Sequence, residues 1–187
     1  MKLLQSYFGV GKRLRYLCQD ESRLGLKTET GKVITTPGVK PVVPVQWQRD
    51  NFWLYGVVEP LSGWQFMQEY SHLDTEHFQQ FIDALSHQLG DDIAIIQLDG
   101  AGAHVTTALK WAENLIPIVQ PPHSPELNPI ERVWQFIKAQ LKGQRFATLD
   151  QLRQRLTQVL GQLTPQRIIS LSSYDFILEA LFCAALN

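Results

Sequence analysis

A chain of 187 residues is long enough to bury a substantial core, and its composition of 44% hydrophobic and 19% charged residues excludes a disordered protein. The net charge of −1 gives no argument from total charge for nucleic-acid binding, but the charges are unevenly spread. Residues 1–40 hold eight Lys/Arg against three Asp/Glu, residues 41–119 two against ten, and residues 120–167 seven against three. The two basic segments could neutralise phosphates if the fold joins them, although scattered surface charge explains the counts equally well.

Neither end of the chain has the pattern of a targeting or membrane-spanning segment. Residues 1–10 hold no long apolar run and lead into a basic stretch, which makes a poor signal peptide. Serines and acidic residues interrupt the apolar residues 168–186, which argues against a membrane span. Cys18 and Cys183 fit no metal-ligand spacing, and so few cysteines are typical of a reducing compartment. We therefore expect a cytoplasmic protein without membrane contact.

The first part of the chain predicts short strands separated by turns. Strands are expected at residues 14–20, 24–27, 52–58 and 64–70. The first of them ends in Asp20, and the second would be its hairpin partner. Three prolines between positions 37 and 44 mark a loop or a sheet edge, because proline cannot donate to a sheet ladder.

From residue 75 onward, helical spacing of apolar residues alternates with short apolar runs. We expect, in order, a helix at 75–89, a strand at 93–98, a short helix at 106–114, a strand at 116–120, a proline-rich loop at 121–129, a helix from 130 that ends near Gly143, a helix at 149–163 and a helix in 168–187. This order predicts an α/β domain with a mixed sheet. Its hairpin portion would be antiparallel, and helical crossovers would lead to its later strands.

Three carboxylates stand where such elements can bring side chains together. Asp20 and Asp99 each close a predicted strand, and Glu131 lies in the first turn of the helix after the proline-rich loop. If the two strands are central neighbours, their ends open into one crevice. Carboxylates gathered there would repel one another unless cations lay between them, and Mg²⁺ or Mn²⁺ prefers such oxygen ligands. Two ions about 3.5–4 Å apart could act on both the attacking and the leaving oxygen of a phosphodiester.

Each carboxylate also has an explanation that needs no metal. Asp99 and the glycine after it could form a simple turn, and Asp20 or its neighbour Glu21 could be an ordinary loop residue. Asn128 and Glu131, with a proline between them at the first helical position, fit a capping box. In that arrangement Glu131 would bond back to the cap amide. Spacing alone leaves both explanations open.

The residues around the carboxylates resemble a known family. The three stretches are QDESRLGL around Asp20, LDGAGAH around Asp99, and PPHSPELNPIERVW, which contains Glu131 and ends at Trp134. They resemble, in the same order, the three catalytic motifs of bacterial insertion-sequence transposases related to the mariner elements. The third stretch is the most specific. The resemblance covers roughly residues 14–145, and on it the chain is identified as a DDE transposase catalytic domain.

The resemblance implies a ribonuclease-H-like fold, which agrees with the order of the elements. Residues 1–187 would form one catalytic domain, with a core at about 14–145 and a helical C-terminal extension at 146–187. Asp20, Asp99 and Glu131 would be catalytic residues and metal ligands, for two Mg²⁺ ions with Mn²⁺ as a substitute. Four further residues would support the site or contact DNA: His104, Asn128, Arg132 and Lys138.

By the same resemblance, the reaction would be cleavage of DNA at transposon ends, followed by strand transfer from the freed 3′-hydroxyl. No covalent protein–DNA intermediate would form. Double-stranded DNA would be the partner, the chain would pair as a homodimer, and it would lie with the bacterial nucleoid. Two other hypotheses stay open. One is a general ribonuclease-H-like nuclease, and the other is a truncated or repurposed remnant that binds DNA or a protein without catalysis.

The sequence departs from the family pattern in three respects. Gly100 replaces the usual Asn after the second aspartate, and His123 replaces the usual Tyr of the third motif. Family members usually carry helix-turn-helix domains before the catalytic core, and few residues precede Asp20. We therefore expect a core without an N-terminal helix-turn-helix domain, which a separate protein or domain could supply.

The histidines near the helix expected at 75–89, and Trp134, have ordinary structural explanations. His72, His77 and His87 flank or lie on the helix expected at 75–89, and no pair among them has a spacing that predicts a zinc site. Trp134 lies on the apolar stripe of its helix and is expected in the core rather than against a nucleobase.

Overall fold

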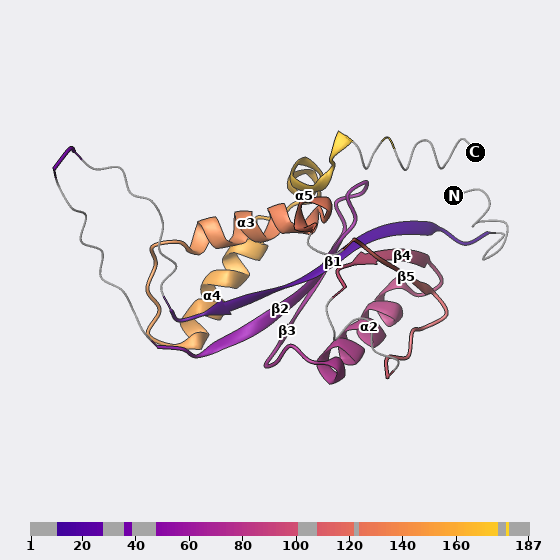
Figure 1. The fold of residues 1–187 in the computed structure, drawn as a ribbon, viewed down its shortest axis with the longest axis horizontal. Coiled ribbons are helices and arrows are strands. Elements are labelled where there is room, and N and C mark those ends of the chain that lie inside the picture. Colours follow the sequence, from indigo (N-terminus) through magenta and orange to yellow (C-terminus); the bar gives the residue numbers. More distant parts are fainter. Residues whose placement is uncertain are drawn as a thin grey trace.

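The fold is built on a five-stranded mixed sheet with the strand order β3-β2-β1-β4-β5 (Figure 1). The computed structural model describes residues 11–27, 36–38, 48–100, 108–121, 124–175 and 179. The strands are β1 (Leu14–Gly25), β2 (Asn51–Val58), β3 (Gln65–Tyr70), β4 (Ile93–Leu98) and β5 (Leu115–Val119). β1, β2 and β3 are antiparallel neighbours, whereas β4 pairs parallel with both β1 and β5. The predicted mixed sheet is therefore confirmed.

The central strand β1 is longer than the sequence predicted. Asp20 lies inside it rather than at its end, and part of the expected hairpin partner at 24–27 belongs to β1 itself. β4 pairs with β1 only as far as Cys18, and β2 pairs with β1 from Cys18 onward. The polar residues after Asp20 stay extended because β2 supplies their backbone hydrogen bonds. The predicted strand end is thus the point where β1 loses β4 as a neighbour.

Helices cover both faces of the sheet (Figure 1). α2 (Thr75–Leu89) lies on one face, and α3 (Ile130–Leu141), α4 (Leu149–Leu160) and α5 (Pro165–Ser172) lie on the other. Alternate residues of β2 point to opposite faces, as the period of a strand requires. Phe52 and Leu54 pack with α3 and α4, whereas Tyr55 and Val57 pack with α2. The sheet therefore separates two hydrophobic clusters.

The prediction of a helix at 106–114 is wrong for residues 108–114, the part that the structure describes. Residues 108–114 form turns and irregular backbone. The side chain of Gln79 on α2 bonds to the backbone of Lys110, accepting from its N–H at 2.8 Å and donating to its carbonyl oxygen at 2.9 Å. Because these bonds occupy both groups of Lys110, they replace the bonds that a helix would provide.

The helices expected at 149–163 and from residue 168 are both present, with shifted bounds. α4 ends at Leu160, and α5 begins at Pro165, earlier than the helix expected from residue 168. Proline restricts the residue before it to an extended conformation, and Thr164 has a ψ of 157°. Its side chain accepts from the backbone N–H of Arg167 and caps the new helix. Within the described residues, no helix combines the length and apolar character needed to cross a membrane.

Candidate active site

Asp20 and Asp99 lie at the same level of two neighbouring parallel strands. The last residue pair between β1 and β4 is Cys18 with Gln97, and each aspartate lies two residues further along its strand. Because side chains two residues apart share a face of the sheet, both aspartates are placed on the face of Cys18. Cys18 belongs to the cluster beneath α3. The expectation that the two strands are central and adjacent is therefore confirmed.

Glu131 reaches the same region from the first turn of α3. The negative charge of Glu131 is among the causes that raise the pKa of Asp20, and the charge of Asp99 is among those that raise the pKa of Glu131. Such effects weaken with distance and are largely screened beyond a Debye length of about 10 Å, so the interacting groups lie close to one another. Glu131 therefore lies within electrostatic range of both aspartates, although the oxygen atoms of the three carboxylates do not all lie within 4.8 Å of one another.

Asp20 is a partly buried carboxyl group in an acidic environment. Burial raises its pKa to about 7, and the charges of Glu21 and Glu131 contribute in the same direction. Two donors act against this shift: the backbone N–H of Glu21 and the indole Nε1 of Trp134, which lies 2.9 Å from Asp20 Oδ2. The salt bridges found among the described residues do not include Asp20. A bound proton or a cation from outside the protein would neutralise the charge of this carboxylate.

Glu131 has a milder environment. Burial raises its pKa, the positive charge of Lys138 lowers it, and Asp99 raises it again. Lys138 lies on α3 like Glu131, about two helical turns away, and is only partly exposed. This lysine therefore interacts with the site through its charge.

The capping-box explanation of Glu131 is wrong. The helix begins after Pro129, and no side chain caps its first N–H groups. Asn128, which is 2% exposed, instead donates from Nδ2 to the backbone carbonyl oxygen of Gln19 at 2.8 Å. Asn128 is pulled to the sheet because this bond satisfies two buried polar groups at once. The bond fixes the start of α3 against β1, one residue before Asp20.

A second bond holds the segment before α3. Gln97 of β4 donates from Nε2 to the carbonyl oxygen of Leu127 and to Gln120 Oε1, both at 3.0 Å, and it accepts from the hydroxyl of Tyr16. Leu127 closes the short 3₁₀ helix η1 (Pro125–Leu127). The sheet therefore positions the loop that carries Glu131 through side chains that sequence reasoning missed. The signal in the sequence was Gln97 itself, because an amide side chain within an otherwise apolar strand needs a hydrogen-bond partner.

Trp134 confirms the expectation of a core residue, being 2% exposed, and it has a further contact that the sequence did not reveal. Its indole bonds to Asp20, as described above, and its ring packs over Gly56, the residue paired with Asp20 on β2. A methyl group on Gly56 would come within 2.7 Å of Trp134 Cη2. The available signal was the spacing: Trp134 is three residues after Glu131 and shares its side of the helix.

The remaining predicted residues have different outcomes. Arg132 is exposed, and its guanidinium carbon lies 4.4 Å from the centre of the Tyr174 ring. His104 and His123 lie outside the described residues. At Gly100 a methyl group would meet only Val119 Cγ1, at 3.6 Å, so the backbone does not require glycine there.

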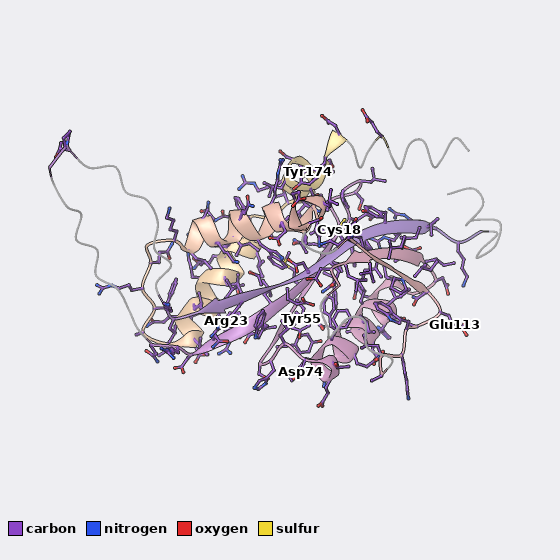
Figure 2. All side chains as sticks on the ribbon, in the orientation of Figure 1. Cys18, Arg23, Tyr55, Asp74, Glu113 and Tyr174 are labelled. Carbon is purple, nitrogen blue, oxygen red and sulfur yellow. The ribbon has the colours of Figure 1, made fainter. Side chains whose placement is uncertain are left out.

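An open groove runs past α3 and includes Glu131 among its lining residues. Its lining residues are Glu126, Leu127, Glu131, Arg132, Gln135, Ser173, Tyr174, Asp175 and Glu179. Tyr174 lies beyond α3 and α5, on the opposite side of the sheet from α2 (Figure 2). Glu131 is thus open to a molecule approaching from the α3 side.

The donor set fits a hard divalent cation. All three candidate ligands are carboxylates, which Mg²⁺ and Mn²⁺ prefer, and no histidine or thiol is brought to them within the described ranges. The raised pKa of Asp20 is a consequence of placing like charges in a partly buried site without a cation.

Comparison with known proteins places the chain in a family. Residues 15–153 match the family model described as DDE superfamily endonuclease. The protein y4pE/y4sA of Sinorhizobium fredii is 38% identical over 87 residues, which are 46% of this chain and 64% of that protein. The chain therefore spans less than two thirds of this curated relative.

Similar solved structures show the same fold. The Mos1 transposase paired-end complex with the left transposon end has a TM-score of 0.67 at 15% identity and covers 85% of this chain and 51% of that chain. The Mos1 mariner paired-end complex with Mn has a TM-score of 0.67 at 16% identity and covers 83% and 51%. The chain spans about half of each Mos1 chain, and the expected ribonuclease-H-like fold is confirmed. The family match over residues 15–153, together with the sheet topology, shows that this chain belongs to the DDE superfamily of endonucleases.

Proposed function

We propose that this chain is the catalytic core of a DNA transposase, in which Asp20, Asp99 and Glu131 hold divalent metal ions. The observation that carries the proposal is the electrostatic coupling of the three carboxylates, of which Asp20 is partly buried with a pKa near 7. A fold maintains such an arrangement at a cost in stability, and groups with strongly shifted pKa values gather at functional sites.

The ions would be Mg²⁺, with Mn²⁺ as a substitute, and we propose two of them. The solved Mos1 complex with Mn supports a divalent ion in this family. When bound, the ions would stabilise the charge that develops on the attacking and leaving oxygens of a phosphodiester. The protein's own part is to hold its ligands in place. Trp134 and the backbone N–H of Glu21 favour the ionised form of Asp20 through their hydrogen bonds.

Three further residues have proposed roles around the triad. Asn128 positions Glu131, because its bond to Gln19 fixes the start of α3 beside Asp20. Arg132 is exposed beside the triad and is suited to a phosphate of the bound strand. His104 stays a proposed supporting residue on the strength of the motif alone.

The reaction would be hydrolysis of a phosphodiester at each transposon end, with water as the nucleophile. Hydrolysis leaves a 3′-hydroxyl and a 5′-phosphate, and the hydroxyl then attacks a phosphodiester of the target, expelling a new 3′-hydroxyl. No side chain of the protein is bonded to DNA in either step. The Mos1 complex with its left transposon end supports double-stranded DNA as the partner. Pairing of two copies completes the proposal.

The test is DNA cleavage in the presence of Mn²⁺. Purified chain would be incubated with a duplex that carries the terminal repeats flanking its gene, with a scrambled duplex and with an RNA–DNA hybrid. The proposal predicts nicking at the repeat boundary that Asp99→Ala reduces by on the order of 10³-fold, because several kcal/mol of charge stabilisation are lost. The matched control is Asp83→Ala on α2, on the far side of the sheet.

Three results would point elsewhere. Cleavage that Asp99→Ala leaves unchanged would contradict the triad. Cleavage of the hybrid without preference for the repeats would favour a general ribonuclease-H-like nuclease. DNA binding with no cleavage at any divalent-ion concentration would favour a remnant that has lost catalysis, a hypothesis motivated by the chain's spanning only about half of the Mos1 proteins.

A further inference from the structure

A second group of candidate metal ligands lies at the junction between β3 and α2. His72, Asp74 and His77 each offer one ligand atom, and these atoms lie within 4.8 Å of one another. The two histidines come from opposite sides of the turn that leads into α2, which explains why their spacing in the sequence predicted no site. The first two residues are exposed and His77 is partly buried, so an ion can reach the group from solvent.

Hydrogen bonds fix the ring of His77. Its Nδ1 lies 2.7 Å from Asp74 Oδ1, and because the ionised carboxylate only accepts, Nδ1 must carry the proton of a neutral ring. The lone pair is then on Nε2. A histidine that donates to a carboxylate through one nitrogen and offers the other is the usual arrangement of a metal-bound imidazole. Asp74 Oδ1 accepts both this bond and a bond from the backbone N–H of His77 at 2.9 Å, so Asp74 orients the His77 ring from the side opposite to Nε2.

The serine before His72 shows where the two rings point. Ser71 Oγ lies 2.9 Å from His72 Nδ1 and 3.3 Å from His77 Nε2. Both nitrogens therefore face one small volume, which the hydroxyl now fills. Rotation of the serine side chain would open that volume to an ion, and imidazole nitrogens bind zinc at about 2.0–2.1 Å.

The backbone around the group is anchored to the core. The hydroxyl of Tyr55, a fully buried residue, donates to the carbonyl oxygen of His72 at 2.9 Å. The ring of Tyr70 contacts the ring of His77 edge to face, with centroids 5.7 Å apart. Asp74 caps α2, which offsets the unfavourable effect of a helix N-terminus on a nearby cation. A site whose ligands are held by packed neighbours loses little entropy when it binds an ion.

We propose that His72 and His77, with Asp74 orienting the His77 ring, form a binding site for a transition-metal ion such as Zn²⁺, separate from the carboxylate triad. Two imidazoles, with water completing the coordination, suit zinc, nickel or copper, whereas the triad suits Mg²⁺. The group lies on the α2 side of the sheet, and the triad lies under α3. Figure 2 shows Asp74 and Tyr174 on opposite sides of the molecule. A bound ion would tie the end of the edge strand β3 to the start of α2.

The test is titration of the full chain with Zn²⁺ by calorimetry, and with Co²⁺ by visible absorption of its complex. The proposal predicts one equivalent bound and a rise in the melting temperature, because an ion that binds only the folded chain stabilises it. His72→Gln and His77→Gln should each weaken Zn²⁺ binding by at least about tenfold, given the share of one ligand in the affinity. The matched control is His87→Gln, which replaces an exposed histidine on the same helix.

The triad variant Asp99→Ala separates this site from the proposed active site. Zn²⁺ binding that survives Asp99→Ala and is lost in His72→Gln supports the second site, whether or not the chain cleaves DNA. Zn²⁺ binding that is lost in Asp99→Ala and unchanged in both histidine variants would assign the ion to the triad and overturn the proposal. Absence of Zn²⁺ binding by the wild-type chain at millimolar concentration would overturn it as well.

Discussion

Two carboxylates beside the central strand are treated in opposite ways. Glu59, which is 3% exposed, follows β2 and accepts from Arg15 at 2.8 and 3.2 Å and from the hydroxyl of Ser62. Asp20, which is partly buried at the level where β1 loses β4, lies near other acids and accepts from an indole. The chain therefore provides Glu59 with a cation, whereas no cationic side chain among the described residues pairs with Asp20.

The difference separates a residue that maintains the fold from one suited to function. Arg15 is itself buried, pairs with Asp92 at 3.6 Å, and lies with its guanidinium carbon 4.1 Å from the centre of a Trp64 ring. These groups compensate one another within the protein. Among the residues that the structure describes, no cationic side chain plays this part for Asp20, which is the reason for proposing a metal ion at that end of the sheet.

The largest effect on stability is expected at the compensated carboxylate. Glu59→Gln leaves the guanidinium of Arg15 buried with only a distant acidic partner. Removing one member of a buried ion pair costs about 3–5 kcal/mol. We therefore expect the free energy of unfolding, measured with urea, to fall by that amount. Mn²⁺ binding per folded molecule should not change, and a loss of less than about 1 kcal/mol would show that the pair behaves like a surface ion pair.

An intermediate effect is expected for the donor that holds Asp20. Trp134→Phe removes a hydrogen bond to a group that is ionised at pH 8, which is worth about 1.5–3 kcal/mol. The control is Trp111→Phe, which replaces a partly buried tryptophan packed on the α2 side. At pH 5 Asp20 is mostly protonated, and the bond to a neutral acceptor is weaker. The excess destabilisation over the control should therefore shrink from pH 8 to pH 5, and an excess independent of pH would indicate a packing effect alone.

An effect of the opposite sign is expected from removing the uncompensated charge. The pKa of Asp20 is about 7 in the folded chain and near 3.8 in the unfolded chain, so folding favours its protonated form. The stability of the wild-type chain is then reduced as the pH rises from about 4 to about 7, and this reduction remains at higher pH. Asp20→Asn has no such charge. At pH 8 and without metal it should be more stable than wild type by about 1–4 kcal/mol, the upper figure being the full pKa shift and the lower one allowing for solvent screening of a partly exposed carboxylate.

The advantage of Asp20→Asn should disappear below pH 4, where wild-type Asp20 is protonated in both states. Saturating Mn²⁺ should reverse the order of stability at pH 8, because only the wild-type chain keeps the full set of carboxylate ligands. An Asp20→Asn chain that is less stable than wild type at pH 8 without metal would contradict the account of this charge.

The sequence predicted those parts of the fold in which local pattern and tertiary context agree. α2 and β4 have the predicted bounds, since each has an unbroken apolar pattern closed by polar residues. The extent of β1 could not be predicted, because the segment after Asp20 is polar and is extended only by pairing with β2. The break between α4 and α5 was predicted, but its limits were not. The apolar spacing continues to residue 163 although α4 ends at Leu160, and Thr164 with its proline starts α5 before residue 168.

The candidate site was predictable in its residue types and not in its supporting contacts. The family-like motifs pointed to Asp20, Asp99 and Glu131. The sequence predicted that Asn128 caps the helix, because capping is a local interaction that spacing can indicate. The side chain of Asn128 bonds instead to Gln19, 109 positions earlier in the chain. The grouping of His72 with His77 depends on the angle between β3 and α2, which no spacing rule contains.

The most direct test of the central claim is the binding of Mn²⁺ followed by electron paramagnetic resonance. The measurement would use a His72→Gln/His77→Gln background, so that only the triad is observed. We predict that Mn²⁺ binds to this chain, that affinity rises with pH up to about 7 as Asp20 loses its proton, and that Asp20→Asn, Asp99→Asn and Glu131→Gln each abolish it. Asp83→Asn should bind as before. Unchanged Mn²⁺ binding in all three triad variants, or none by the unmodified triad at millimolar concentration, would contradict the account.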